Sequence, residues 1–152
     1  MHKKEQRDIA LFIVDIFVSI VKIKEYVNPF NDEDEFRHSS LHWDASIRQL
    51  EMIGEALNNL LKDESFASLS PNYFRKIVNF RNVISHGYFG IDTEEVWDVI
   101  SHKLILLNDD LVNIVHNANI DLHYAIKTTV DEYNVLNDKE IVDYLIALSK
   151  RL

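Results

Sequence analysis

The amino-acid sequence predicts an all-α fold, an antiparallel up-and-down helical bundle. Apolar residues recur at spacings of three and four along almost the whole chain, as they do on one face of an α-helix. Gly and Pro number only 3 and 2, too few for a β fold with many tight turns. The connections between the expected helices are short, which makes neighbouring helices run antiparallel.

The first expected helix contains the apolar stretch Ile9–Val21 and continues to Val27. We expect it to end before Pro29, because the residue before a proline disfavours the α conformation. Asp15 interrupts the apolar stretch, and no small-residue cleavage site follows it. The stretch is also shorter than a membrane span requires. We therefore interpret it as a core helix and expect a cytoplasmic protein that does not bind a membrane.

The middle of the chain predicts two further helices. Residues 31–35 form an acidic connector, and a helix is expected from about Leu41 to Lys62. The next helix is expected to begin with Ser70 as N-cap and Pro71 in the first position, an arrangement that helices favour. Gly87 is expected to end it.

The last third of the chain predicts a fourth helix and two weaker helical segments. Asp92 and Glu95 have the spacing of a capping box at the start of the fourth helix. The weaker segments are roughly Leu122–Tyr133 and Asp138–Leu152.

The domain organisation that follows is simple, because no internal repeat or long linker is visible. We predict a helical bundle over residues 1–118 with a C-terminal helical extension over residues 119–152, packed on the same domain. A length of 152 residues fits one domain.

The composition excludes several classes of protein. Cys is absent, so disulfides, thiolate catalysis and Cys-ligated zinc are ruled out. No glycine-rich phosphate loop is present, which argues against an ATPase or a dehydrogenase. The net charge of −9 argues against indiscriminate binding of nucleic acid.

One segment departs from this acidic average. From Ser65 to Ile91 there is no Asp or Glu, whereas Arg75, Lys76 and Arg81 give the segment a charge of +3. A buried helix also has few charges, but it gains nothing from three cations. We interpret the segment as a local anion-facing surface.

A motif lies inside the acid-free segment: Arg81-Asn82-Val83-Ile84-Ser85-His86-Gly87-Tyr88, an R-x4-H-x-Y pattern. Upstream, the expected second helix carries Gly54-Glu55-Ala56. Together these elements resemble the signature of HEPN domains, in particular the HepT-like (DUF86) branch of toxin ribonucleases. The resemblance covers roughly residues 6–118. It implies a four-helix core that forms a homodimer and cuts RNA as an endonuclease without a metal or another cofactor.

The resemblance also implies a partner. HepT-like toxins are usually paired with a small nucleotidyltransferase antitoxin, MntA, in a toxin–antitoxin system. That partner adenylylates the motif tyrosine, which here is Tyr88. The added bulk and negative charge would repel RNA.

The motif residues suit RNA cleavage through the 2′-OH, which gives a 2′,3′-cyclic phosphate and a 5′-hydroxyl. His86 is expected to handle protons, since imidazole titrates near neutrality. Arg81 is expected to hold and stabilise the charged phosphate. Asn82 stands four residues before His86 and could orient its ring. Arg75 and Lys76 are candidates for RNA binding.

The spacing of the two catalytic candidates imposes a condition. Arg81 and His86 are five residues apart, which is about 140° around an ideal helix. Either the helix ends before His86, or the two residues serve different chains. A two-fold dimer would duplicate both at one axis.

Other candidates carry weaker signals. Gly54 inside a helix costs about 1 kcal/mol relative to Ala, so close helix packing is expected there. Glu55 could pair with a motif cation or face water. His38 and His42 lack the carboxylate spacing of a zinc motif, and we expect no metal site.

A function of another class stays open. A non-catalytic helical module could bind nucleotide or assist a nucleotidyltransferase. The acidic balance favours this alternative, and the complete motif favours the ribonuclease.

Overall fold

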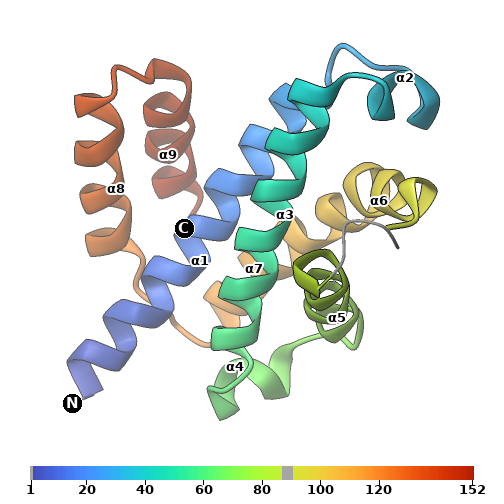
Figure 1. Cartoon of the computed structure of the whole chain (residues 1–152). Helices are drawn as coiled ribbons and strands as arrows, with labels where there is room; N and C mark the ends of the chain where they lie inside the picture. Colours follow the sequence, from blue (N-terminus) through green and yellow to red (C-terminus); the bar gives the residue numbers. More distant parts are fainter. Residues whose placement is uncertain (1, 87–90) are drawn as a thin grey trace.

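The computed structural model describes residues 2–86 and 91–152, and that part of the chain contains helices and no strand (Figure 1). The prediction of an all-α bundle is confirmed. Its main helices are α1 (His2–Val27), α3 (Ser40–Leu60), α5 (Tyr73–His86) and α7 (Leu104–Asn117). Helices α1 and α3 run antiparallel along much of their length. Among the described helices, none combines the length and the apolar character that a membrane crossing requires.

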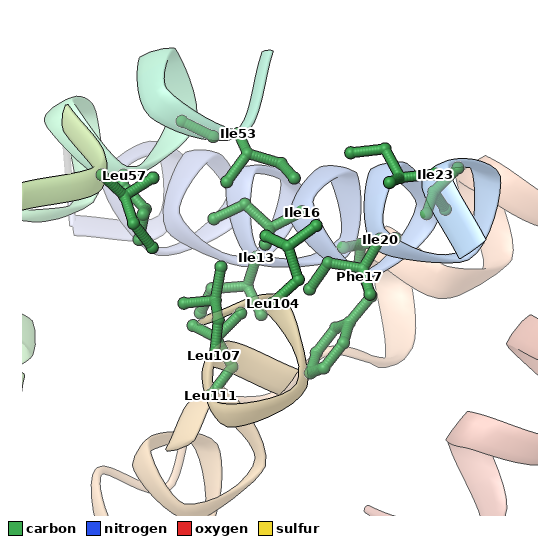
Figure 2. Packing of buried hydrophobic residues seen from close by; sticks show 14 of the residues in the cluster. Ile13, Ile16, Phe17, Ile20, Ile23, Ile53, Leu57, Leu104, Leu107 and Leu111 are labelled. Atoms are coloured by element: carbon green, nitrogen blue, oxygen red, sulfur yellow. The ribbon is translucent and has the colours of Figure 1, made fainter. Parts of the chain in front are cut away.

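The core is centred on α1. Figure 2 shows side chains of α1, α3 and α7 meeting in one apolar cluster. Ile13, Ile16 and Ile20 of α1 are fully buried, as are Ile53 of α3 and Leu107 of α7. Burial of each such side chain contributes about 1.5–3 kcal/mol. The helix ends at Val27, before Pro29, as the sequence predicts.

The acidic connector forms a helix of its own, so its interpretation as a connector is wrong in part. Helix α2 (Glu33–Arg37) begins after Asp32, whose Oδ1 accepts a hydrogen bond from the backbone N–H of Glu35 at 2.9 Å. Acidic residues in a first turn also suit the positive end of the helix dipole. Phe36 anchors α2, because its ring is fully buried.

Ser70 ends a helix instead of beginning one, which corrects the expected start of α5. A short helix α4 (Glu64–Leu69) precedes it, and the Ser70 hydroxyl donates to the carbonyl oxygen of Phe66 at 2.7 Å. The hydroxyl is therefore used by the helix behind it. Helix α5 begins at Tyr73, two residues after Pro71.

The predicted fourth helix is interrupted. Asp92 caps α6 (Thr93–Asp98), and its Oδ1 accepts hydrogen bonds from the backbone N–H groups of Glu94 and Glu95, as the spacing predicts. A π-helical turn, η2 (Val99–Lys103), then leads into α7. Such a turn adds a residue to the helix and shifts its phase.

The C-terminal segments form the hairpin of α8 (His123–Val135) and α9 (Lys139–Arg151), which lies on the other side of α1 from α3 (Figure 1). Two cation–π contacts join α8 to α1. Arg7 lies 5.3 Å from the ring centre of Tyr124, and Lys22 lies 4.9 Å from that of Tyr133. The extension thus packs on α1, while a domain boundary at residue 118 stays a prediction.

Between these two contacts the junction of α1 and α8 carries like charges. Loss of water around the Asp15 carboxyl, followed by the negative charge of Glu132 on α8, raises the pKa of Asp15 to about 6. The folded protein therefore favours the neutral acid more than the unfolded chain does. Its ionisation destabilises the fold as the pH rises from the ordinary value of 3.8 through about 6.

Helices α3 and α5 approach each other closely at Gly54. A Cβ atom added to Gly54 would lie 2.3 Å from Cβ and 2.7 Å from Cγ of Arg81. Both atoms belong to the base of the Arg81 side chain, which cannot swing away as a flexible end could. The expected close helix packing at Gly54 is confirmed.

We expect Asp15→Asn to stabilise the protein at pH 7.5 by up to about 1 kcal/mol, since the carboxyl is partly exposed and the effect is screened by water. The gain should shrink as the pH falls from 6 towards 3.8. Urea unfolding at several pH values measures it. Asp8→Asn, at an exposed position of the same helix, is the control. A variant that is no more stable than wild type at pH 7.5 would contradict the pKa assignment.

We expect Gly54→Ala to destabilise the protein by about 1–3 kcal/mol, because the methyl group overpacks the contact with Arg81. The helix propensity of Ala acts in the opposite direction, by up to about 1 kcal/mol. The control is Asn58→Ala, at an exposed position of the same helix. Equal or greater stability of Gly54→Ala in urea unfolding would show that α5 does not require this close approach.

Candidate active site

Helix α5 turns most of its apolar residues to the core and its exposed face to solvent; Val83 is the exception among the apolar residues, with 50% of its surface exposed. Phe74, Ile77 and Ile84 are buried. The exposed side chains of the helix include Arg75 and Lys76, the two candidates for RNA binding, along with Asn79 and Asn82. Two of the three cations of the acid-free segment, Arg75 and Lys76, are therefore on the surface, which the anion-facing interpretation requires.

A polar contact fixes the start of α5 against α7. The Tyr73 hydroxyl donates a hydrogen bond to Asp110. Burial of the hydroxyl, followed by this bond and the negative charges of Asp110 and Asp109, raises the pKa of Tyr73 well above its usual range. Tyr73 thus stays a neutral donor, and α5 is held at its start by α7 and further along by α3.

Arg81 is the motif residue whose surroundings are best defined. Its Nη2 donates to Glu55 of α3, and its Nη1 donates to the amide oxygen of Asn82 at 3.0 Å. The Arg81 side chain is 29% exposed and that of Glu55 is 54% exposed. Of the two alternatives for Glu55, the structure shows the pairing with a motif cation. Such a partly exposed pair contributes about 0–1 kcal/mol, so its main effect is to orient the guanidinium.

Two consecutive residues of α3, Gly54 and Glu55, jointly set the position of the Arg81 side chain. Gly54 leaves room for the base of the side chain, and Glu55 binds its end. A larger residue at position 54 would move the guanidinium away from α3. The Gly-Glu pair on α3 is thus the structural counterpart of the arginine on α5.

The residue at which α5 ends decides between the two alternatives for Arg81 and His86: either the helix ends before His86, or the two residues serve different chains. The helical backbone continues through His86, so the helix does not end before this residue. On a continuous helix the backbone positions 81 and 86 lie about 140° apart around the axis. The side chain of His86 and the whole of Tyr88 lie outside the described residues. The predicted roles of both, and the contact of Asn82 with His86, stay predictions.

A pocket of about 300 Å³ opens beside Arg81, between α1, α3 and α5. Its apolar lining comes from Phe12, Met52 and Ala56, and its charged lining comes from Asp15, Arg48, Glu51, Glu55 and Arg81. The sequence interpretation did not find the pocket. A sequence feature that could have indicated it is the spacing of the charged residues at positions 48, 51 and 55, which places them along one face of α3.

The remaining histidine candidates make local contacts. The Nδ1 atom of His38 lies 2.7 Å from the carbonyl oxygen of Asp34, and that of His42 lies 2.7 Å from the Ser39 hydroxyl. Within the part of the chain that the structure describes, no three His, Asp or Glu side chains are placed to share a metal ion.

The chain has clear relatives among known proteins. A "Gamma-glutamylcyclotransferase and putative RNase" of Methanocaldococcus jannaschii is 28% identical over 137 residues, which are 89% of this chain and 59% of that protein. The chain thus spans less than two thirds of that relative. A "Putative RNase" of the same organism is 33% identical over 100 residues, 65% of this chain and 80% of that protein. A "Probable ribonuclease HepT" of Thermococcus cleftensis is 30% identical over 103 residues, 67% of this chain and 88% of that protein.

No solved structure matches the chain significantly. The family described as "Ribonuclease HepT-like" matches residues 16–117, which end at the last residue of α7. The hairpin of α8 and α9 lies outside this match. The match includes Gly54, Glu55 and the whole R-x4-H-x-Y motif, so it confirms the resemblance in the sequence: the chain belongs to the HepT-like ribonuclease family.

Proposed function

We propose that the protein is a metal-independent RNA endonuclease that acts in the cytoplasm as the toxin of a toxin–antitoxin pair. Membership of a ribonuclease family supports RNA as the substrate. The observation that carries the proposal is the placement of Arg81, whose guanidinium lines a pocket beside α5, a helix whose exposed face carries Arg75 and Lys76 and no acid of its own. Such a face attracts the phosphates of RNA although the chain as a whole is acidic.

In the proposed reaction the ribose 2′-oxygen attacks the adjacent phosphorus, and the bond from phosphorus to the 5′-oxygen breaks. The 2′-hydroxyl loses a proton and the leaving oxygen gains one, which is the role assigned to His86. Arg81 stabilises the extra negative charge on the phosphate oxygens. Asn82 and Glu55 position Arg81, and Arg75 and Lys76 contact neighbouring phosphates. The products are a 2′,3′-cyclic phosphate and a 5′-hydroxyl.

We propose a homodimer for a geometric reason. Because α5 is helical through His86, positions 81 and 86 of one chain face different directions. A two-fold axis near α5 would bring Arg81 of one protomer to His86 of the other and supply two imidazoles. The active site would then be shared between protomers.

The control point of the proposed pair is Tyr88. A minimal nucleotidyltransferase of the MntA type would act as the antitoxin and adenylylate this hydroxyl. The adenylate would place a negative charge next to a site that binds phosphate and would repel RNA.

A non-catalytic module that binds nucleotide or assists a nucleotidyltransferase is the second candidate. The net charge of −9 favours it, because each encounter with RNA must overcome repulsion. Cleavage assays separate the two.

We expect His86→Ala to lower the rate of RNA cleavage by about 10²–10⁴-fold, the usual contribution of a general acid or base. Arg81→Ala should lower it by about 10²–10³-fold, because the charged phosphate loses its stabilisation. Purified protein, labelled tRNA and a chelator provide the assay. His102→Ala, an exposed histidine that contacts Asp98 of its own turn, is the matched control.

Mixing the two inactive variants tests the shared site. A heterodimer of Arg81→Ala and His86→Ala subunits keeps one intact pair of Arg81 and His86 across the axis, so part of the activity should return. Undiminished cleavage by His86→Ala would refute the catalytic assignment. Inactivity of the mixture would refute the shared site alone.

We expect the cognate nucleotidyltransferase, supplied with ATP, to add one adenylate to the protein and to abolish RNA cleavage. Tyr88→Phe should accept no adenylate and remain active in the presence of the partner, because phenylalanine lacks the hydroxyl. Mass spectrometry of the intact protein and the tRNA assay measure the two effects. Tyr124→Phe, an exposed tyrosine on α8, is the control and should still be modified. Adenylylation of Tyr88→Phe would place the control point elsewhere.

A further inference from the structure

The pocket beside Arg81 has the size and lining of a site for a small planar group. Its volume of about 300 Å³ is at the lower end of the range for ligand pockets. Phe12 from α1 and Met52 from α3 supply apolar surface, and Met52 is 40% exposed. Proteins that bind single-stranded RNA stack splayed bases on aromatic rings, and here such a ring lies next to the arginine that is proposed to bind phosphate.

The charges of the pocket disfavour an anion. Three carboxylates line it against two guanidinium groups, and one of those, that of Arg81, is already paired with Glu55. Any phosphate in the pocket beyond the one assigned to Arg81 would be repelled by these carboxylates. A neutral group with N–H donors would instead find carboxylate acceptors.

Glu51 and Arg48 have hydrogen-bonding capacity left for a ligand. Arg48 Nη1 lies 3.7 Å from Glu51 Oε2, which is longer than a hydrogen bond. Glu51 is an acceptor and Arg48 is a donor, three residues apart on the same face of α3. Guanine offers the complementary groups: two N–H donors on its Watson–Crick edge, and the acceptors O6 and N7, which arginine binds in a bidentate manner.

We propose that this pocket binds a guanine base of the RNA, stacked on Phe12, with Glu51 accepting from its N1–H and 2-amino groups and Arg48 donating to O6 and N7. The inference rests on the proposed function, because the phosphate next to this guanine is the one that Arg81 holds. Arg81 lines the same pocket, so base and phosphate of one nucleotide can be bound side by side. Cleavage is then directed to guanine.

The experiment maps cleavage positions in a single-stranded RNA of random sequence. Wild type should cut next to guanine in preference to uridine. Glu51→Gln should reduce this preference about tenfold, since the amide group faces the guanine donors with its own N–H groups. Glu25→Gln makes the same charge change at an exposed position of α1 away from the pocket, and its preference should equal that of wild type. Thermal unfolding of both variants verifies that they are folded.

Modified bases test the assignment atom by atom. Inosine lacks the 2-amino group, so wild type should cut next to inosine less efficiently than next to guanosine. Glu51→Gln should not distinguish inosine from guanosine. A wild-type enzyme that cuts without base preference, or a preference unchanged by Glu51→Gln, overturns the inference and leaves the proposed function intact.

The pocket can also be tested without cleavage. If wild type cuts no RNA, the proposed function fails, and binding of guanosine 5′-monophosphate and uridine 5′-monophosphate to the full chain is compared by NMR. Tighter binding of the guanosine nucleotide, lost in Glu51→Gln, supports the guanine pocket on its own. Equal binding of the two, or binding of neither, overturns it.

Discussion

The close approach of α3 and α5 at Gly54 is the constraint on which the candidate site depends. The base of the Arg81 side chain occupies the space where any other residue would carry a Cβ atom. Packing therefore sets the position of the arginine, and the partly exposed pair with Glu55 adds mainly orientation. A guanidinium whose side chain is packed at its base and hydrogen-bonded at its end needs little reorganisation when it binds a phosphate, which is the property required of a group that stabilises developing charge.

Helix α1 connects the site to the rest of the molecule. Its buried residues pack against α3 and α7. On another side, Arg7 and Lys22 of α1 contact the rings of Tyr124 and Tyr133 of α8. Asp15 stands where these regions meet, because it lines the pocket beside Arg81 and also senses the charge of Glu132. The C-terminal hairpin is outside the family match, yet it is electrostatically coupled to one wall of the pocket.

The distribution of charge suits an acidic protein whose proposed substrate is a polyanion. The exposed face of α5 carries Arg75 and Lys76 without neighbouring acids on its own segment, while the carboxylates are spread over the rest of the chain. The carboxylates elsewhere repel a polyanion, which limits non-specific binding. The pocket adds acceptors next to this surface, which can discriminate between bases but cannot hold a second phosphate.

Local sequence patterns determined where the long helices lie, because the apolar period of an α-helix and the caps at its ends depend on neighbouring residues; the short helices α2 and α4 were not predicted. The end of α1 before Pro29 and the cap at Asp92 were predicted in this way. Tertiary structure decided which of two neighbouring helices a capping residue serves, and which residues distant in the sequence contact each other. Ser70 could have capped either of two helices, and its hydroxyl bonds to the earlier one. Glu55 and Arg81 are 26 residues apart, and periodicity shows that a face is buried without showing which helix buries it. The pocket, built from three helices, could be recognised only once those helices were packed together.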